Sequence, residues 1–188
     1  MTDRQQGAPL RAFLIHGLAG GRPFHFSGGL DVLARKLNAQ GVKASVHAQG
    51  SFLRPYGEVE RLANAARAAA GRGERPVLIG HSMGSDAALK VAVQLQTARI
   101  GVPLVVCFDP TSFRLLFGPP PVPANVARVL CFYQKISPLG RGLLKVAPGF
   151  KGALIQQQVA TIHSAVDDDP ALHARVLAEV KALQQSAA

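Results

Sequence analysis

One serine lies in a sequence pattern that can make its hydroxyl a nucleophile. Ser82 is the centre of Gly80-His81-Ser82-Met83-Gly84, which matches the pattern G-x-S-x-G. The apolar run before it predicts a strand and the spacing after it predicts a helix, so the serine would stand on a sharp turn between them. The two glycines remove Cβ atoms that would collide in such a turn. The alternative is an ordinary glycine-rich turn between a strand and a helix.

The backbone N–H of Met83 would point into the same space as this hydroxyl. It belongs to the first turn of the predicted helix, where the helix dipole favours negative charge. We therefore expect this N–H to stabilise the oxyanion that forms when a serine attacks a carbonyl group.

A nucleophilic serine needs an imidazole that removes its proton. Six histidines compete for this role: His16, His25, His47, His81, His163 and His173. His163 alone follows a predicted late strand, at roughly 158–162, and precedes the last predicted helix. We therefore expect His163 to be the base; the alternative is a histidine in a surface loop.

The elements that would position these residues alternate between short apolar strands and amphipathic helices. This pattern predicts an α/β fold: a doubly wound, mainly parallel sheet of about six strands with helices on both faces. The expected strands are 12–16, 42–48, 76–80, 102–108, 126–133 and roughly 158–162. The expected helices are about 28–40, 59–66 with a stop at Gly71, 88–95, and one from Pro170 onward, capped by Asp169. In such sheets the site lies at the carboxyl ends of the strands.

Composition narrows the class of protein. With 48% hydrophobic and 17% charged residues, the chain is typical of globular proteins, and we expect a single domain over 1–188 with its core at about 11–185. Cys107 and Cys131 form no C-x-x-C pair, so we expect buried free thiols and no metal or cofactor. No apolar run approaches the roughly 18 residues of a membrane helix, and the start has no signal-peptide core. These features predict a soluble, cytoplasmic protein; oligomeric state cannot be read from them.

The net charge of +10 favours anionic partners. Between Asp109 and Asp167 there is no acidic residue but there are six basic ones. A nucleic-acid partner is not expected, because the basic residues are neither clustered on one helix nor interleaved with aromatic residues. The charge predicts either a solvated basic surface or a basic rim around a site for an acidic or lipid-like ligand.

Three ordered features resemble the α/β-hydrolase fold over about residues 11–185. They are the run His16-Gly17-Leu18-Ala19-Gly20-Gly21 after the first strand, the run around Ser82, and an Asp and then a His at strand ends. The chain resembles the minimal version of this fold, similar in size to small lidless lipases and esterases, and also resembles thioesterases. The resemblance implies that Leu18 supplies the second oxyanion N–H and that His16 orients its loop by hydrogen bonds.

The resemblance also implies the acid, because in this fold the order is Ser, then Asp or Glu, then His. The acidic residues between Ser82 and His163 in the sequence are Asp86 and Asp109. We interpret Asp86 as a first-turn helix acid that favours the dipole, and we expect Asp109, at the end of the fourth strand, to be the acid. Many members carry this residue one strand later, whereas pancreatic-type lipases and thioesterase domains carry it here.

Three more acids stand close to His163 in the sequence. Asp167, Asp168 and Asp169 are interpreted as cap and first-turn charges of the last helix. The alternative is that one of them contacts the imidazole.

Together these features predict a serine hydrolase that acts on carboxylic esters or thioesters. Its substrate would be a small or lipid-like acyl compound. Residues 137–157 are interpreted as a flexible wall of the substrate site, or else as a plain crossover with a short helix. Phe113, Leu115, Leu116 and Phe117 are interpreted as another wall or as core. The alternative functions are a non-catalytic binding or scaffolding protein of the same fold, and electrostatic adhesion to nucleic acid or anionic membrane.

Overall fold

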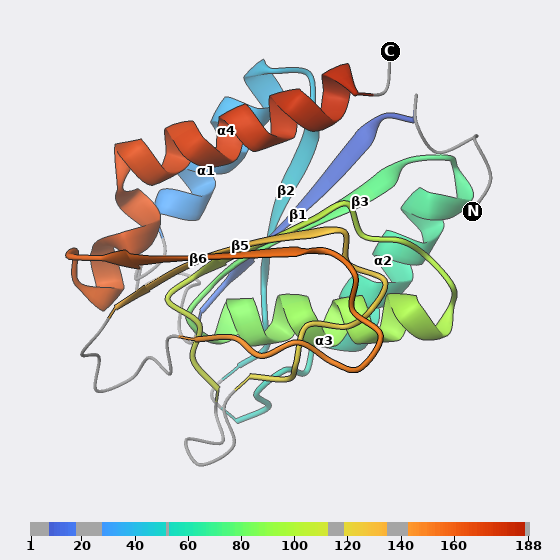
Figure 1. Cartoon of the computed structure of the whole chain (residues 1–188), viewed down its shortest axis with the longest axis horizontal. Helices are drawn as coiled ribbons and strands as arrows, with labels where there is room; N and C mark the ends of the chain where they lie inside the picture. Colours follow the sequence, from blue (N-terminus) through green and yellow to red (C-terminus); the bar gives the residue numbers. More distant parts are fainter. Residues whose placement is uncertain (1–7, 18–27, 52, 113–118, 135–142, 187–188) are drawn as a thin grey trace.

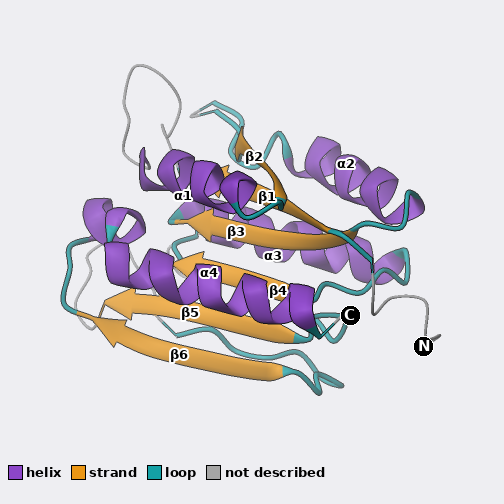
Figure 2. Cartoon of the chain, turned by 90° about the horizontal axis from the view of Figure 1, so that it is seen from above, coloured by secondary structure: helices purple, strands orange, loops and turns teal. Residues whose placement is uncertain are grey.

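A six-stranded sheet, with all neighbouring strands parallel, runs through the molecule in the order β2-β1-β3-β4-β5-β6 (Figures 1 and 2). The computed structural model describes residues 8–17, 28–51, 53–112, 119–134 and 143–186. The strands are β1 (Leu10–His16), β2 (Lys43–Ala48), β3 (Arg75–His81), β4 (Leu104–Phe108), β5 (Arg128–Gln134) and β6 (Ala153–Val159). The predicted parallel α/β sheet is confirmed.

Helices cover both faces of this sheet, as predicted. They are α1 (Gly28–Ala39), α2 (Val59–Gly71), α3 (Met83–Thr97) and α4 (Pro170–Gln185). Figure 1 shows α1 and α4 on one face and α2 and α3 on the other. Each pair buries its own apolar cluster, one around Leu62 and Val105, the other around Leu33 and Val106. Val105 and Val106 enter opposite clusters because successive strand residues point to opposite faces.

The predicted strand before His163 was misplaced. The sequence suggested roughly 158–162, whereas β6 covers Ala153–Val159 and pairs only with β5. Its sequence is ALIQQQV, and its three glutamines keep partial solvent contact at the edge of the sheet. An edge strand does not need the continuous apolar run that is typical of the central strands. The polar residues of β6 therefore gave no clear strand pattern in the sequence.

The flexible wall predicted at 137–157 is wrong for its described part, residues 143–157. Residues 153–157 belong to β6, Leu144 is buried in the core, and Val146 forms a parallel bridge with Val122. The described residues 143–152 form turns and this bridge, and they contain no helix. Residues 137–142 lie outside the described part of the chain, as do Phe113, Leu115, Leu116 and Phe117.

The start of α4 divides the three neighbouring acids. The Asp169 side chain accepts hydrogen bonds from the N–H groups of Ala171 at 2.8 Å and Leu172 at 3.4 Å, which confirms the predicted cap. Asp167 and Asp168 instead belong to a 3₁₀ helix, His163–Asp168. Asp167 is fully buried there, so its interpretation as a helix-end charge is wrong.

Because all six strands are parallel, their carboxyl ends lie at one edge of the sheet. The chain leaves β1 for β2 on one side and then crosses to β3 on the other. Loops that diverge at such a switch point leave room for a site beyond the carboxyl ends of the strands. The segments after β1, β3, β4 and β6 begin at this edge and carry Gly17, Ser82, Asp109 and His163.

The two cysteines lie opposite each other on adjacent central strands. Cys107 in β4 and Cys131 in β5 are register partners, and both are buried thiols that form no disulfide bond, as predicted. Burial raises the pKa of Cys107 to about 12 and also raises the pKa of Cys131. Both thiols therefore stay protonated and unreactive in the folded protein. No helix among the described residues is long and apolar enough to span a membrane.

Candidate active site

Ser82 occupies a strained turn between β3 and α3. Its backbone has φ 55° and ψ −125°, a combination that is dominated by glycine in proteins. The turn is held by the neighbouring strand end: the Ser82 N–H donates to the Phe108 carbonyl at 2.9 Å, and the Thr111 N–H donates to the Ser82 carbonyl at 3.2 Å. The loop after β4 thus fixes the backbone that carries the hydroxyl.

The flanking glycines of the motif are required by close packing. A Cβ atom on Gly84 would lie 2.0 Å from the Ile15 carbonyl oxygen, and one on Gly80 would lie 2.3 Å from the backbone of Gly84. Neither neighbour can move, because both are backbone atoms of the central sheet or of the first turn of α3. The glycines therefore allow α3 to start directly against β1 and β3, which aims its N-terminus at the edge of the sheet.

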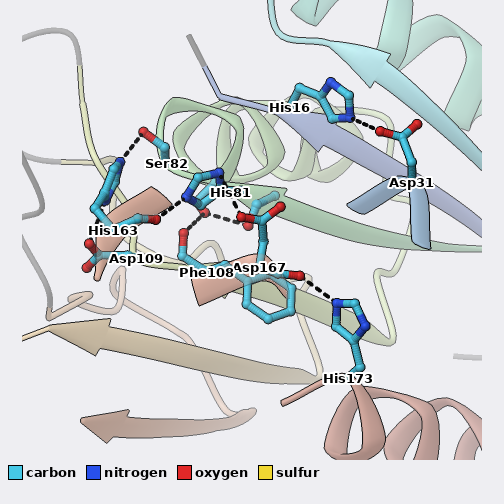
Figure 3. A network of polar contacts seen from close by, with 11 residues as sticks. His16, Asp31, His81, Ser82, Phe108, Asp109, His163, Asp167 and His173 are labelled. Carbon is cyan, nitrogen blue, oxygen red and sulfur yellow. Dashed lines mark hydrogen bonds and ion pairs between the residues drawn. The ribbon is translucent and has the colours of Figure 1, made fainter. Parts of the chain in front are cut away.

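The imidazole of His163 connects Ser82 with Asp109 (Figure 3). His163 Nε2 lies 3.0 Å from Ser82 Oγ, and His163 Nδ1 lies 2.6 Å from Asp109 Oδ2. The three predicted residues come from the ends of β3, β4 and the 3₁₀ helix after β6. The structure therefore brings together a hydroxyl, an imidazole and a carboxyl group in the linear order that proton transfer from the serine needs.

Asp109 is fixed as firmly as Ser82. It is fully buried and has φ 41°, which is a strained value for a residue with a side chain. Its N–H donates to the Phe132 carbonyl at 2.7 Å, and its Oδ1 accepts from the Gln134 N–H at 3.2 Å. The end of β5 thus holds one oxygen of the carboxyl group while the other contacts His163.

The two predicted oxyanion donors have different outcomes. Met83 is the first residue of α3, so its N–H has no acceptor within the helix. Leu18 lies outside the described residues. Gly17, just before it, packs so closely that a Cβ atom there would lie 2.9 Å from Ser82 Cβ. Gly17, the second residue of the run His16–Gly21, thus packs against the serine.

His16 contacts the first turn of α1. Its Nε2 lies 3.1 Å from Asp31 Oδ2, and Figure 3 shows its ring directed at that carboxyl group. Asp86, the other acid between Ser82 and His163, is buried and pairs with Lys90 one turn along α3, at 2.6 Å. Of the two acids, Asp109 is therefore the one that contacts the His163 imidazole, and Asp86 pairs with Lys90.

Two buried residues close to His163, His81 and Asp167, contact each other, and sequence analysis did not predict this contact. His81 Nε2 lies 2.8 Å from the backbone oxygen of His163, and His81 Nδ1 lies 3.5 Å from Asp167 Oδ1. Burial lowers the pKa of His81 to about 4, although its bond to the His163 backbone opposes this. Burial, reinforced by Asp168, raises the pKa of Asp167 to about 7. No linear signal joins positions 81 and 167; only the fold does.

The described residues offer no group of three or more His, Cys, Asp or Glu side chains that could hold a metal ion. At this edge of the sheet, Ser82, His163 and Asp109 are joined by hydrogen bonds. The chemistry that they can perform is proton transfer and nucleophilic attack.

Comparison with solved structures shows the α/β-hydrolase fold. One similar structure comes from work on LipS and LipT, two metagenome-derived lipolytic enzymes, with 14% identity, coverage of 94% of this chain and 95% of that chain, and a TM-score of 0.63. A second is the RedJ thioesterase of prodiginine biosynthesis from Streptomyces coelicolor, with 16% identity, 93% and 92% coverage, and a TM-score of 0.58. A third is a proposed hydrolase of the alpha/beta superfamily from Xanthomonas campestris pv. campestris, with 21% identity, 94% and 95% coverage, and a TM-score of 0.56.

Similarity by sequence adds no further relative. No protein-family model matches the chain. No curated protein matches its sequence. The three structures share at most 21% sequence identity with this chain. At this level of identity they establish its fold alone.

The strain at Ser82 gives a stability prediction. We expect Ser82→Gly to be more stable than Ser82→Ala by about 1 kcal/mol, because strain at a non-glycine residue costs about 1–3 kcal/mol and both variants lose the hydroxyl. At an ordinary position glycine is the less stable of the two by roughly 0.5–1 kcal/mol, and the same pair at Ser164, exposed on the 3₁₀ helix, is the control. Urea unfolding measures both differences; a glycine variant less stable than the alanine variant at position 82 would contradict the strain.

Proposed function

We propose that this protein is a serine hydrolase that cleaves carboxylic esters or thioesters through an acyl-enzyme on Ser82. The observation that carries the proposal is the chain of contacts from Asp109 Oδ2 to His163 Nδ1 at 2.6 Å and from His163 Nε2 to Ser82 Oγ at 3.0 Å. The fold supports it, because structures of lipolytic enzymes and of a thioesterase share that fold over more than nine tenths of the chain.

The first step is attack by the serine. Because the Asp109 carboxylate can only accept, it fixes the His163 proton on Nδ1 and leaves the lone pair of Nε2 facing Ser82. Nε2 takes the hydroxyl proton as Oγ bonds to the carbonyl carbon, and the carbonyl electron pair moves onto its oxygen. The N–H groups of Met83 and Leu18 stabilise this oxyanion, each by roughly 3 kcal/mol as in other oxyanion holes.

The next steps release the two products. The tetrahedral intermediate collapses, and the leaving alcohol or thiol takes the proton from His163 Nε2, which leaves the acyl group on Ser82. Water then attacks the acyl carbon while His163 Nε2 accepts its proton, and the acid leaves as Oγ recovers a proton. Asp109 stabilises the charged imidazole in both halves, as a buried carboxylate in contact with Nδ1 does.

The proposed substrate is a lipid-like or anionic acyl compound. The net charge of +10 favours an anionic ligand. Esters and thioesters pass through the same tetrahedral oxyanion, so the residues proposed above serve both. A series of p-nitrophenyl esters and acyl thioesters of graded chain length ranks the two classes by kcat/KM.

Covalent labelling tests the proposed nucleophile. We expect a fluorophosphonate to label the folded wild-type protein once, on the peptide that contains Ser82, because His163 and Asp109 activate this hydroxyl. Mass spectrometry of the digested protein locates the label. Ser82→Ala is expected to abolish labelling, and Ser164→Ala, at an exposed serine of the neighbouring 3₁₀ helix, is expected to leave it unchanged. A folded wild-type protein that is not labelled would refute the proposal.

Substitution of the acid tests the proposed role of Asp109. We expect Asp109→Asn to lower kcat toward a p-nitrophenyl ester by about 10⁴-fold, because an amide N–H can favour the wrong tautomer of the imidazole. The fold is expected to persist, since Asn fills the same space and can still accept the Gln134 N–H. Glu60→Gln, at an exposed acid in α2, is the control and should retain wild-type kcat. Wild-type activity of Asp109→Asn would reassign the acid.

A further inference from the structure

His81 lies between the nucleophile turn and the segment that carries His163 (Figure 3). It precedes Ser82 in the chain and its side chain is 2% exposed. Its ring contacts the His163 ring at a tilt of 39°, with the centroids 5.1 Å apart, and its Nε2 lies 2.8 Å from the His163 backbone oxygen. Because a carbonyl oxygen can only accept, Nε2 must be the donor of this hydrogen bond. In a neutral His81 ring, Nδ1 therefore carries no proton and can accept a hydrogen bond.

Asp167 faces this unprotonated nitrogen. Its Oδ1 lies 3.5 Å from His81 Nδ1, and the residue is fully buried. Burial raises the pKa of this carboxyl group to about 7, so its protonated form, which can donate to Nδ1, is well populated near neutral pH. In this arrangement neither partner carries a buried charge, and one imidazole bridges two points of the 3₁₀ helix: the carbonyl of His163 and the side chain of Asp167.

The rest of the fold holds Asp167 in place. A Cβ atom on Gly29 would lie 2.0 Å from the Asp167 backbone oxygen, so the first turn of α1 packs directly on this residue. The N–H groups of Gly29 and Leu30 lie close enough to the carboxyl group to lower its pKa against the effect of burial. The backbone oxygen of Asp167 also accepts from His173 Nε2 at 2.5 Å, and Lys36 Nζ lies 3.2 Å from Nδ1 of the same ring.

We propose that His81 and Asp167 are positioning residues for the reaction proposed above, and that His81 fixes the His163 backbone relative to Ser82 through its Nε2–H. The reason lies in connectivity. Ser82 follows His81 directly in the chain. A hydrogen bond from the His81 ring to the His163 carbonyl therefore restrains the distance between Ser82 Oγ and His163 Nε2. Asp167 favours this tautomer of His81 because its carboxyl group faces Nδ1. The inference rests on the proposed function only in its kinetic part.

Two substitutions of His81 separate its hydrogen bond from its bulk. Gln carries an amide N–H at about the reach of Nε2, whereas Phe fills the ring space and has no donor. We expect His81→Phe to lower kcat by about 10- to 100-fold with KM little changed, because a misplaced base slows the chemical step. We expect His81→Gln to recover most of this loss. His47→Phe, at a half-buried histidine in β2, is the control and should retain wild-type kcat.

The outcomes are distinguishable. Wild-type kcat in His81→Phe, or an equal loss in both folded variants, would overturn the role of the Nε2–H. The equivalent pair at Asp167 is Asp167→Asn, whose amide can donate to Nδ1, and Asp167→Ala, which cannot. We expect the first to keep kcat near wild type and the second to lower it; equal activity of the two would remove Asp167 from the proposal. Thermal unfolding of every variant separates loss of fold from loss of positioning.

A spectroscopic measurement on the wild-type protein needs no turnover. In wild-type protein labelled with nitrogen-15 and carbon-13, NMR reports which ring nitrogen of each histidine carries the proton, and the backbone assignment of the same protein identifies the His81 ring. We expect His81 at pH 7 to be neutral and protonated on Nε2. A proton on Nδ1 would overturn the proposed bond to His163 even if every variant failed to fold. A wild-type protein with this tautomer but without labelling or turnover would refute the proposed function and leave the hydrogen bond intact.

Discussion

The rest of the site depends on the contact between Asp109 and His163, which joins two chain segments that are far apart in sequence. The carboxyl group is buried, and it reaches Nδ1 at 2.6 Å. A buried carboxylate without partners would be costly; here the Gln134 N–H and the imidazole both donate to it. With Nδ1 engaged in this way, the remaining nitrogen of His163 faces Ser82 as an acceptor, and from this the proposed chemistry follows.

The sheet makes that contact possible by imposing unusual backbone conformations at two strand ends. Ser82 and Asp109 both have positive φ. Each donates its backbone N–H to a carbonyl of the neighbouring strand, Ser82 to Phe108 and Asp109 to Phe132. Parallel register between β3, β4 and β5 places these acceptors where they are needed. The strain is thus offset by a rigid scaffold, as expected of functional sites.

The sequence predicts the parallel sheet, the nucleophile turn and the cap at Asp169, because each depends on residues close together in the chain. The proximity of Asp109 and His163 was also anticipated, from the order Ser, Asp, His in the fold that the chain resembles. The glutamine-rich β6 was misplaced, because an edge strand needs no apolar run. Asp167 was misassigned for a different reason: its burial is created by α1, α4 and His81, which meet only in the folded protein. Three consecutive acids look alike in sequence, and packing alone distinguishes them.

The most direct measurement is to trap the intermediate that the contact between Asp109 and His163 would make possible. Wild-type protein is mixed with a p-nitrophenyl ester and quenched in acid within one turnover, and mass spectrometry of the digest locates the acyl group. We expect a burst of p-nitrophenol equal to the protein concentration and one acyl group on the Ser82 peptide, with neither in His163→Ala. Turnover with no acyl group on Ser82, or an unchanged burst in His163→Ala, would contradict the central claim that this imidazole activates this serine.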